Sequence, residues 1–373
     1  MSGPLKTIKP SVRALKAYSL SPHHASIKIN QNENPFDAPA PIKEEALRRL
    51  AKRSWSRYPD FIPTGLNERL ADFASWRPDG VIAGNGSNEL IQALLMVTIG
   101  PADRVLISEP TFALYRQVTT VLGGELVSVP LNAEFQFDVD SLLRSVEETK
   151  PDVVILCSPN NPTGCVIRDE DLRRLLQTAP GLVVIDEAYH EFAEHSVVSL
   201  LSEFENLVVL RTFSKAIALA AFRVGYLLAA PDLVTEIRKA VLPYNLNVFS
   251  QTVAEVAVEM YARELLPLVK LMIAERGRVF DEVKVIGGLE PVESHANFMI
   301  VRAAQGPKKV FDQLLKRDIL IRDVSSYPML SEYFRASVGT PEENDCLIQS
   351  LRELMLQPQP EQVGKGGLPP PVA

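Results

Sequence analysis

Lys215 is the residue of this chain whose position most strongly suggests chemistry. Together with Ser214 it ends the stretch 206–215, whose apolar residues read as a buried strand. Open α/β sheets bind their ligands at the carboxyl ends of strands, and a lysine held there can lose its proton and attack a carbonyl group. Arg223 follows eight residues later, just before a second apolar run, 224–230.

Two other apolar runs also end in polar side chains. One leads into a loop with Asn161, and the next leads into Asp186 and Tyr189. Each residue alone has a simpler interpretation, as a turn residue, a helix cap or a loop charge. Those interpretations do not explain why all of them follow apolar runs. Together with Lys215 and Arg223, they predict a binding site for pyridoxal phosphate.

The chemistry of that cofactor accounts for the set. Lys215 supplies the amine that holds the aldehyde as a Schiff base. A buried carboxylate such as Asp186 keeps the ring nitrogen protonated, which makes the ring an electron sink. Asn161 and Tyr189 can donate hydrogen bonds to the ring hydroxyl. The hydroxyls and the guanidinium suited to the phosphate are those of Thr212, Ser214 and Arg223.

A second anion-binding element is expected upstream. Gly86, Ser87 and Asn88 precede the apolar stretch 90–97, which reads as a helix. The glycine permits a close backbone approach, and Ser87 or Asn88 can cap the helix and leave its first amides to an anion. The segment matches neither the P-loop nor the complete dinucleotide motif, so it does not indicate nucleotide binding.

An aromatic side chain to stack on a pyridine ring is available in the segment 110–115. Phe112 and Tyr115 are both candidates, and either could equally be a core residue.

At this point the chain resembles a known family, the fold-type I aminotransferases of class II, and within it the histidinol-phosphate branch. The resemblance covers residues 15–355. The matching segments, in family order, are 32–35 (NENP), 57–60 (RYPD), 84–89 (GNGSNE), 158–164 (SPNNPTG), 186–189 (DEAY), 212–215 (TFSK) with 223–226 (RVGY), 243–245 (PYN), 294–298 (SHANF), 321–323 (IRD) and 334–340 (FRASVGT).

The resemblance implies a role for each matching residue. Lys215, Asp186 and Tyr189 would be the catalytic residues, and Tyr115 would stack on the cofactor ring. Tyr58 would reach the cofactor phosphate of a second subunit, which implies a homodimer. The residues expected to contact substrate are Tyr18, Asn34, Tyr244, Asn297, Arg322 and Arg335.

Composition agrees with a soluble, cytoplasmic enzyme. The net charge is −7, from 39 basic and 46 acidic residues, which favours neither nucleic acid nor an anionic membrane as partner. Three cysteines are an odd number in a long chain, so a disulfide framework is not expected. The five histidines form no zinc pattern. No apolar segment approaches the ~18 residues of a membrane span.

The order of the patterns predicts an α/β protein. Residues 1–45 are rich in proline and polar residues and form an arm. From 46 to 260, apolar strands alternate with amphipathic helices, which implies a mainly parallel sheet covered on both faces; the resemblance implies seven strands. A helix from 252 to 281 leads into a smaller α/β domain, 261–356, with strands near 297–301 and 319–322. The tail 357–373 cannot bury a core and should be disordered.

The sequence therefore predicts an aminotransferase that uses pyridoxal phosphate, a small-molecule amino donor and a 2-oxo acid acceptor. Histidinol phosphate and 2-oxoglutarate are the expected pair. Three alternatives remain: an aromatic amino acid aminotransferase, a relative of threonine-phosphate decarboxylase, and a binding module of the same fold without catalysis. The last is disfavoured because Lys215 and Asp186 are both present.

Overall fold

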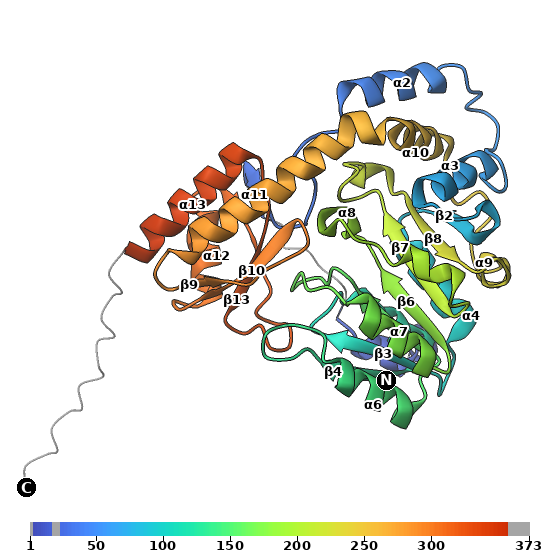
Figure 1. The fold of residues 1–373 in the computed structure, drawn as a ribbon, viewed down its shortest axis with the longest axis horizontal. Helices are drawn as coiled ribbons and strands as arrows, with labels where there is room; N and C mark the ends of the chain where they lie inside the picture. Colours follow the sequence, from blue (N-terminus) through green and yellow to red (C-terminus); the bar gives the residue numbers. More distant parts are fainter. Residues whose placement is uncertain (1–2, 17–22, 357–373) are drawn as a thin grey trace, which may run out of the picture.

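The structure is a computed structural model that describes residues 3–16 and 23–356 of the chain. Figure 1 shows two lobes, with the long helix α11 (Leu266–Lys284) lying along the boundary between them. The larger lobe holds a seven-stranded sheet, and the smaller lobe holds a four-stranded sheet with helices packed on it. The predicted tail and Tyr18 lie outside the described residues.

The large sheet has the strand order β2-β8-β7-β6-β5-β3-β4. Neighbouring strands are parallel except at β8, which runs antiparallel to both β2 and β7. The prediction of an α/β protein with a mainly parallel seven-stranded sheet is confirmed. The strands are β2 (Val81–Gly84), β3 (Arg104–Glu109), β4 (Glu125–Pro130), β5 (Val153–Cys157), β6 (Leu182–Asp186), β7 (Leu207–Thr212) and β8 (Gly225–Ala229).

Central strands are apolar on both sides because helices cover both faces of the sheet. On β7, Leu207 and Val209 face a core shared with α2, α3, α6, α7 and α10, whereas Val208 and Leu210 face a core shared with α4, α5 and α9. These helices are α2 (Ala40–Leu50), α3 (Thr64–Ala74), α4 (Ser87–Thr98), α5 (Leu114–Leu122), α6 (Val139–Thr149), α7 (Asp169–Thr178), α9 (Pro231–Arg238) and α10 (Val248–Met260). Shorter turns are η1 (Pro4–Thr7), α1 (Pro10–Ala14), η2 (Pro78–Gly80), α8 (His190–Ala193), η3 (Val198–Ser202) and η4 (Ala220–Phe222).

The helix predicted over 252–281 consists of two α-helices. α10 continues through a π-helical turn, η5 (Tyr261–Leu265), into α11. The expected domain boundary at 260/261 therefore falls inside a continuous helical stretch. The division into an arm, a large domain and a small domain stays a prediction.

The smaller lobe is built on an antiparallel sheet of order β12-β13-β10-β9. Its strands are β9 (Leu289–Pro291), β10 (Phe298–Ala303), β12 (Arg322–Asp323) and β13 (Tyr333–Ser337), and its helices are α12 (Pro307–Leu315) and α13 (Pro341–Leu356). A separate parallel pair joins β1 (Ile27–Lys28) to β11 (Ile319–Leu320). This pairing ties the N-terminal segment to the smaller lobe, and it places residues 30–34 between the two lobes.

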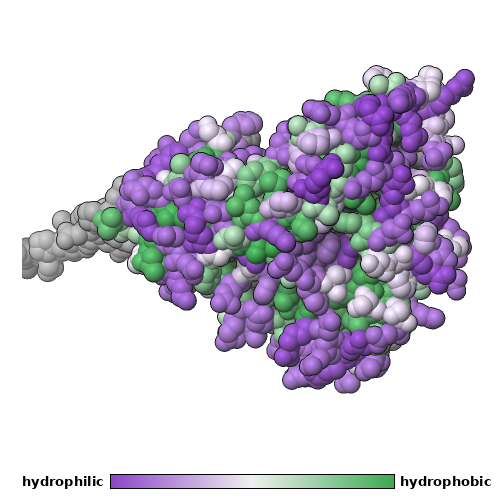
Figure 2. All heavy atoms as spheres, turned by 45° about the horizontal axis from the view of Figure 1, so that its top comes forward, coloured by the Kyte–Doolittle hydropathy of each residue, from purple (hydrophilic) through white to green (hydrophobic). Residues whose placement is uncertain are grey.

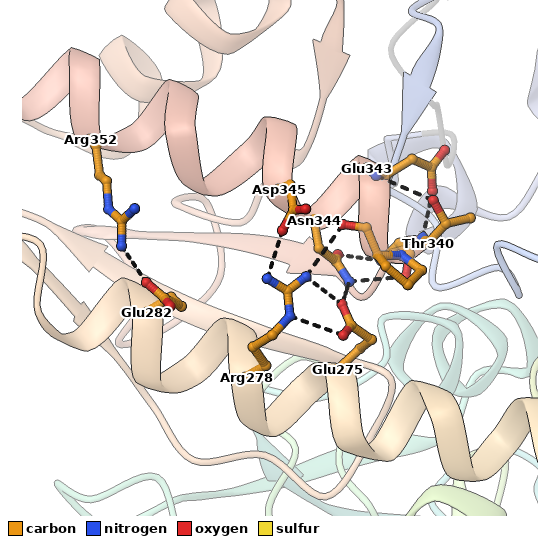
Figure 3. Close-up of polar contacts among 10 residues, drawn as sticks. Glu275, Arg278, Glu282, Thr340, Glu343, Asn344, Asp345 and Arg352 are labelled. Atoms are coloured by element: carbon orange, nitrogen blue, oxygen red, sulfur yellow. Dashed lines mark hydrogen bonds and ion pairs between the residues drawn. The ribbon is translucent and has the colours of Figure 1, made fainter.

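Polar contacts hold the end of β13 against α11 and α13 (Figure 3). Glu275 accepts hydrogen bonds from Asn344 Nδ2 at 2.8 Å and from Arg278 Nη2 at 2.6 Å. Asn344 Oδ1 in turn accepts the backbone N–H of Gly339 at 2.8 Å. Because Gly339 lies two residues after Ser337, this network joins the segment that follows β13 to α11 and α13.

The surface is mainly polar, with apolar patches on the face that Figure 2 shows. Among the large apolar side chains that are exposed, several lie in two segments, 55–62 and 242–244. Within the described ranges, every helix is too short or too polar to span a bilayer.

Candidate active site

A cavity of about 560 Å³ opens where β5, β6 and β7 end, and residues from the smaller lobe complete its wall. Most of the side chains that the sequence placed in a cofactor site line this cavity. The predicted residues in its wall are Ser87, Asn88, Asn161, Asp186, Tyr189, Thr212, Ser214, Lys215, Arg223, Arg322 and Arg335.

Lys215 lies three residues beyond the end of β7. Its Nζ donates a hydrogen bond to the backbone carbonyl of Gln31 at 2.9 Å. Burial lowers the pKa of Lys215 to about 8, and the positive charge of Arg335 acts in the same direction. Because an amine with this pKa is partly neutral near pH 8, Lys215 is suited to act as a nucleophile and as a base.

Asp186 is the last residue of β6, opposite Cys157 on β5. Its carboxylate is buried and accepts two hydrogen bonds, from the Tyr115 hydroxyl to Oδ2 at 2.7 Å and from the backbone N–H of Ala188 to Oδ1 at 3.1 Å. Burial raises the pKa of Asp186 to about 6, although the bond from Tyr115 opposes that rise. A carboxylate in this setting would gain from a cationic partner in the cavity.

The two aromatic candidates have different positions. Tyr115 lies in the first turn of α5, where it is fully buried in the core, and it does not line the cavity. Phe112, just before α5, does line the cavity, and its ring meets the Tyr115 ring edge-on at 5.7 Å. The aromatic side chain in the cavity wall is therefore Phe112 and not the expected Tyr115. The Tyr115 hydroxyl instead donates to Asp186 from within the core.

Tyr189 follows β6 and receives two amide donors at its hydroxyl. Asn161 Nδ2 lies 3.3 Å from the hydroxyl oxygen and Asn32 Nδ2 lies 3.0 Å from it. Asn161 is oriented by Arg335, whose Nη1 donates to Asn161 Oδ1 at 2.6 Å. Burial raises the pKa of the Tyr189 phenol, so the phenol stays protonated at neutral pH.

The first amides of α4 face Arg223 and form an anion-binding corner. The expected cap by Ser87 or Asn88 is absent: Gly86 is the N-cap residue and no side chain caps the helix. Gly86 has a φ of 79°, which favours glycine, and a Cβ atom there would lie 2.7 Å from Nη2 of Arg223, so a side chain would strain the backbone and displace the guanidinium. Arg223 Nη1 also donates to Ser214 Oγ at 3.1 Å. Uncapped helix amides, a guanidinium and hydroxyls together suit a phosphate.

The donor set fits pyridoxal phosphate. It combines a phosphate corner, a buried carboxylate, donors to a ring oxygen, an aromatic wall and an amine at the end of a strand. Among the described residues, no group of three His, Cys, Asp or Glu side chains could hold a metal ion.

Arg322 and Arg335 are direct partners in the register of β12 and β13, and both line the cavity. The alternative interpretation, a surface ion pair with Glu332 or Asp323, does not describe the contacts of those acids. Glu332 pairs with Arg302 at 2.9 Å, and Asp323 accepts the backbone N–H of Ser325. Two guanidinium groups in one wall can bind phosphates or carboxylates.

Other residues expected at the site lie outside the cavity wall. Tyr58 is 81% exposed and stacks on Tyr244, with ring centroids 4.6 Å apart. Asn34 Nδ2 donates to the backbone carbonyl of Ala216 at 3.1 Å, beside Lys215. Asn297 Nδ2 donates to the carbonyls of Asn32 and Glu33. The role of Tyr58 at the cofactor phosphate and the roles of Asn34, Tyr244 and Asn297 at the substrate stay predictions.

Three consecutive residues, Asn30, Gln31 and Asn32, line the cavity and were not predicted as site residues. Their backbone carbonyls accept from Arg335, Lys215 and Asn297 respectively. The asparagines of this run were a usable signal, since Asn is among the residues other than Gly that most readily adopt the left-handed conformation found at Asn32.

Comparisons with known proteins agree with this geometry. The family model "Aminotransferase class I and II" matches residues 25–351. A histidinol-phosphate aminotransferase from Chlorobium phaeobacteroides is 40% identical over 354 residues, which are 94% of this chain and 98% of that protein. A Sinorhizobium meliloti protein of the same name, solved in complex with pyridoxal-5'-phosphate, has a TM-score of 0.84 at 24% identity and covers 94% of this chain and 97% of its own. An L-threonine-O-3-phosphate decarboxylase from Porphyromonas gingivalis shares the fold, with a TM-score of 0.78 at 22% identity, covering 89% of this chain and 100% of its own.

Proposed function

This chain belongs to the class I and II aminotransferases, and on that premise we propose that it transfers the amino group of histidinol phosphate to 2-oxoglutarate. The cofactor is pyridoxal 5'-phosphate. The products are imidazole-acetol phosphate and glutamate, which places the reaction in histidine biosynthesis.

One observation carries the proposal: an amine, a buried carboxylate and a pair of arginines line a single cavity. Lys215 and Asp186 come from the ends of adjacent strands of the large sheet, while Arg322 and Arg335 come from adjacent strands of the small sheet. The first pair serves the cofactor. The second pair serves the anionic groups of the substrates.

When bound, pyridoxal phosphate supplies an aldehyde that takes up the amino group and a ring that withdraws electrons from the reacting carbon. Lys215 would hold the cofactor through Nζ and afterwards accept and release a proton at that atom, whose pKa is about 8. Asp186 would hold the ring nitrogen through its buried carboxylate. Tyr189 and Asn161 would hold the ring oxygen, and Phe112, which lines the same cavity, would be the aromatic side chain beside the ring.

Arg322 and Arg335 orient the substrates. The reaction needs one site that accepts two anions in turn, the phosphate of histidinol phosphate and the carboxylates of 2-oxoglutarate or glutamate. Guanidinium forks bind either oxyanion in a bidentate way. Arg335 is itself held by Asn161 Oδ1 and by the carbonyl of Asn30, so its direction is fixed before substrate arrives.

We further propose that the active unit is a homodimer. Trp55, Tyr58 and Phe61 are 67%, 81% and 61% exposed, and Tyr58 and Phe61 contact the ring of Tyr244. Clusters of exposed aromatic side chains are typical of protein interfaces. A second copy of the chain covering this cluster would also bring Tyr58 to a cofactor phosphate. The cytoplasmic location expected from the sequence stays a prediction.

A coupled assay with four amino donors tests the function. Histidinol phosphate should exceed unphosphorylated histidinol in kcat/KM by at least about a hundredfold, since two bidentate contacts are lost without the phosphate. It should also be used more efficiently than phenylalanine. Carbon dioxide release from threonine phosphate would instead support the decarboxylase alternative. Equal use of phenylalanine and histidinol phosphate would support the aromatic aminotransferase alternative.

A further inference from the structure

We propose that Asn32 is a positioning residue that fixes the direction of the Tyr189 phenolic hydrogen and couples that direction to the small sheet. Asn32 is 1% exposed and has a φ of 55°, so its backbone lies in the left-handed region. The group that Tyr189 faces in the cavity is identified from the proposed function; the hydrogen bonds of Asn32 are those of the chain itself.

Every polar atom of Asn32 has a partner from another part of the chain. Its N–H donates to Ser337 Oγ at 2.9 Å, and its Oδ1 accepts from the same hydroxyl at 3.0 Å. Its carbonyl accepts from Asn297 Nδ2 at 3.1 Å, and its Nδ2 donates to the Tyr189 hydroxyl at 3.0 Å. Ser337 ends β13 and Asn297 precedes β10, whereas Tyr189 follows β6. One side chain therefore joins the small sheet to the large one.

The pattern of donors and acceptors sets both amide orientations. Ser337 Oγ accepts the backbone N–H of Asn32 and donates its own hydrogen to Asn32 Oδ1, and in this arrangement Nδ2 faces Tyr189. Asn161 is oriented in the same way, because the Arg335 guanidinium can only donate, and it does so to Asn161 Oδ1. Each amide thus presents its NH₂ group to the Tyr189 oxygen.

Two donors leave one direction for the phenolic hydrogen. The hydroxyl oxygen accepts from Asn32 and Asn161, and neither partner can take the hydrogen of Tyr189. Since Tyr189 lines the cavity, its hydrogen is turned into the cavity and serves as a donor there. Under the proposed function the acceptor is the anionic oxygen of the cofactor ring.

The substitution Asn32→Asp reverses this arrangement with little change of shape. A carboxylate accepts hydrogen bonds and does not donate them, and aspartate tolerates the left-handed backbone as asparagine does. Tyr189 would then donate to the new carboxylate, and the ring oxygen would lose the donor that Tyr189 provides. Loss of a donor disfavours the ionised ring oxygen, so the pH midpoint of the bound cofactor's visible absorbance should move to higher pH by about one unit.

The experiment measures the pH midpoint of the bound cofactor's visible absorbance in five proteins. They are the wild type, N32D, Y189F, S337A and the double variant N32D/Y189F. If Asn32 acts through Tyr189, N32D and Y189F each raise the midpoint, and the double variant matches Y189F alone. S337A should shift the midpoint in the same direction by a smaller amount, because the amide of Asn32 is then free to turn. Should N32D not fold, S337A alone and S337A combined with Y189F give the same comparison.

Asn206→Asp is the matched control. Asn206 is partly buried at the start of β7, and its Nδ2 donates to the carbonyls of Leu176 and Gly181, at the opposite end of the strand from Lys215. It should lower the unfolding temperature without moving the midpoint. An unchanged midpoint in folded N32D, or additive shifts in the double variant, would overturn the inference while leaving the proposed function intact. A wild-type protein that takes up no pyridoxal phosphate would overturn both.

Discussion

The hydroxyl of Tyr115 lies 2.7 Å from Oδ2 of Asp186, in a core with no measurable exposure at the tyrosine ring. Asp186 lines the cavity, whereas Tyr115 lies in the core and does not line it. The bond from Tyr115 stabilises the carboxylate form of Asp186 against the burial that raises its pKa to about 6. The pKa of the Asp186 carboxyl, which faces the cavity, is thus lowered by a residue that does not line the cavity.

Tyr115→Phe should reduce turnover about tenfold while keeping the fold. Hydrogen bonds to charged groups typically contribute about 1.5–3 kcal/mol, and ~1.4 kcal/mol corresponds to a factor of ten in rate. The measurement is kcat as a function of pH, with the thermal unfolding temperature as the check on folding. A wild-type kcat across the whole pH range would show that the bond has no role in turnover.

Tyr115→Phe should also change how the stability of the cofactor-free protein depends on pH, in a direction that can be stated in advance. Asp186 has a folded pKa above its ordinary value of 3.8, so its contribution to stability is complete below pH 3.8 and is lost as pH rises through the folded pKa. Removing the Tyr115 donor moves that folded pKa higher. The apoprotein of Y115F should therefore keep losing stability above pH 6, where the contribution of Asp186 in the wild type has levelled off. Parallel stability curves for the two proteins would contradict this.

Asp186→Asn should preserve the fold and lower kcat by roughly a hundredfold or more, because breaking a buried ion pair costs about 3 kcal/mol or more. The amide keeps the size of the side chain and loses its charge. Single-turnover kinetics with histidinol phosphate, compared with the melting temperature, separate the two effects. A rate within a factor of about three of wild type would exclude a charge role for this residue.

Arg322→Lys should raise the KM for histidinol phosphate about tenfold, since a bidentate contact becomes a single one. Arg335→Lys should damage both half-reactions more severely, because it also releases Asn161 and the carbonyl of Asn30. Arg302→Lys is the control, since Arg302 forms exposed pairs with Glu290 and Glu332 away from the cavity wall. Equal effects in all three variants would argue against a specific anion site.

The proposed homodimer predicts that Tyr58→Phe weakens cofactor retention and leaves the fold and the molecular mass unchanged. Within one chain Tyr58 stacks on Tyr244 and does not line the cavity. Equilibrium dialysis of the cofactor and light scattering provide the two readouts. A fully active monomer, or a Y58F variant that retains the cofactor like wild type, would contradict the shared site.

The ends of the strands were predictable from the sequence because a continuous apolar run indicates a buried strand. That is why Asn161, Asp186 and Lys215 could be assigned to one edge of the sheet before their positions were known. The reversed direction of β8 was not predictable in this way, since an apolar run has the same pattern in either orientation.

Two features of the site could not be predicted from the sequence. One depends on which side of a helix a residue faces, and the other depends on contacts between residues far apart in the chain. The choice between Phe112 and Tyr115 depended on where α5 starts, and that start places Tyr115 in the core. The role of Asn32 depends on Ser337, 305 residues away in the chain. Local patterns carry no information about partners at such separation, so only the folded arrangement brings them together.

Borohydride reduction of the loaded protein shows which amine binds the cofactor. Reduction fixes the cofactor to the lysine that holds it, and peptide mass spectrometry then locates the label. We expect the label on Lys215, three residues beyond the end of β7, and no label in Lys215→Ala. A label on any other lysine of the wild-type protein, or an undiminished label in Lys215→Ala, would show that Lys215 is not the residue that binds the cofactor.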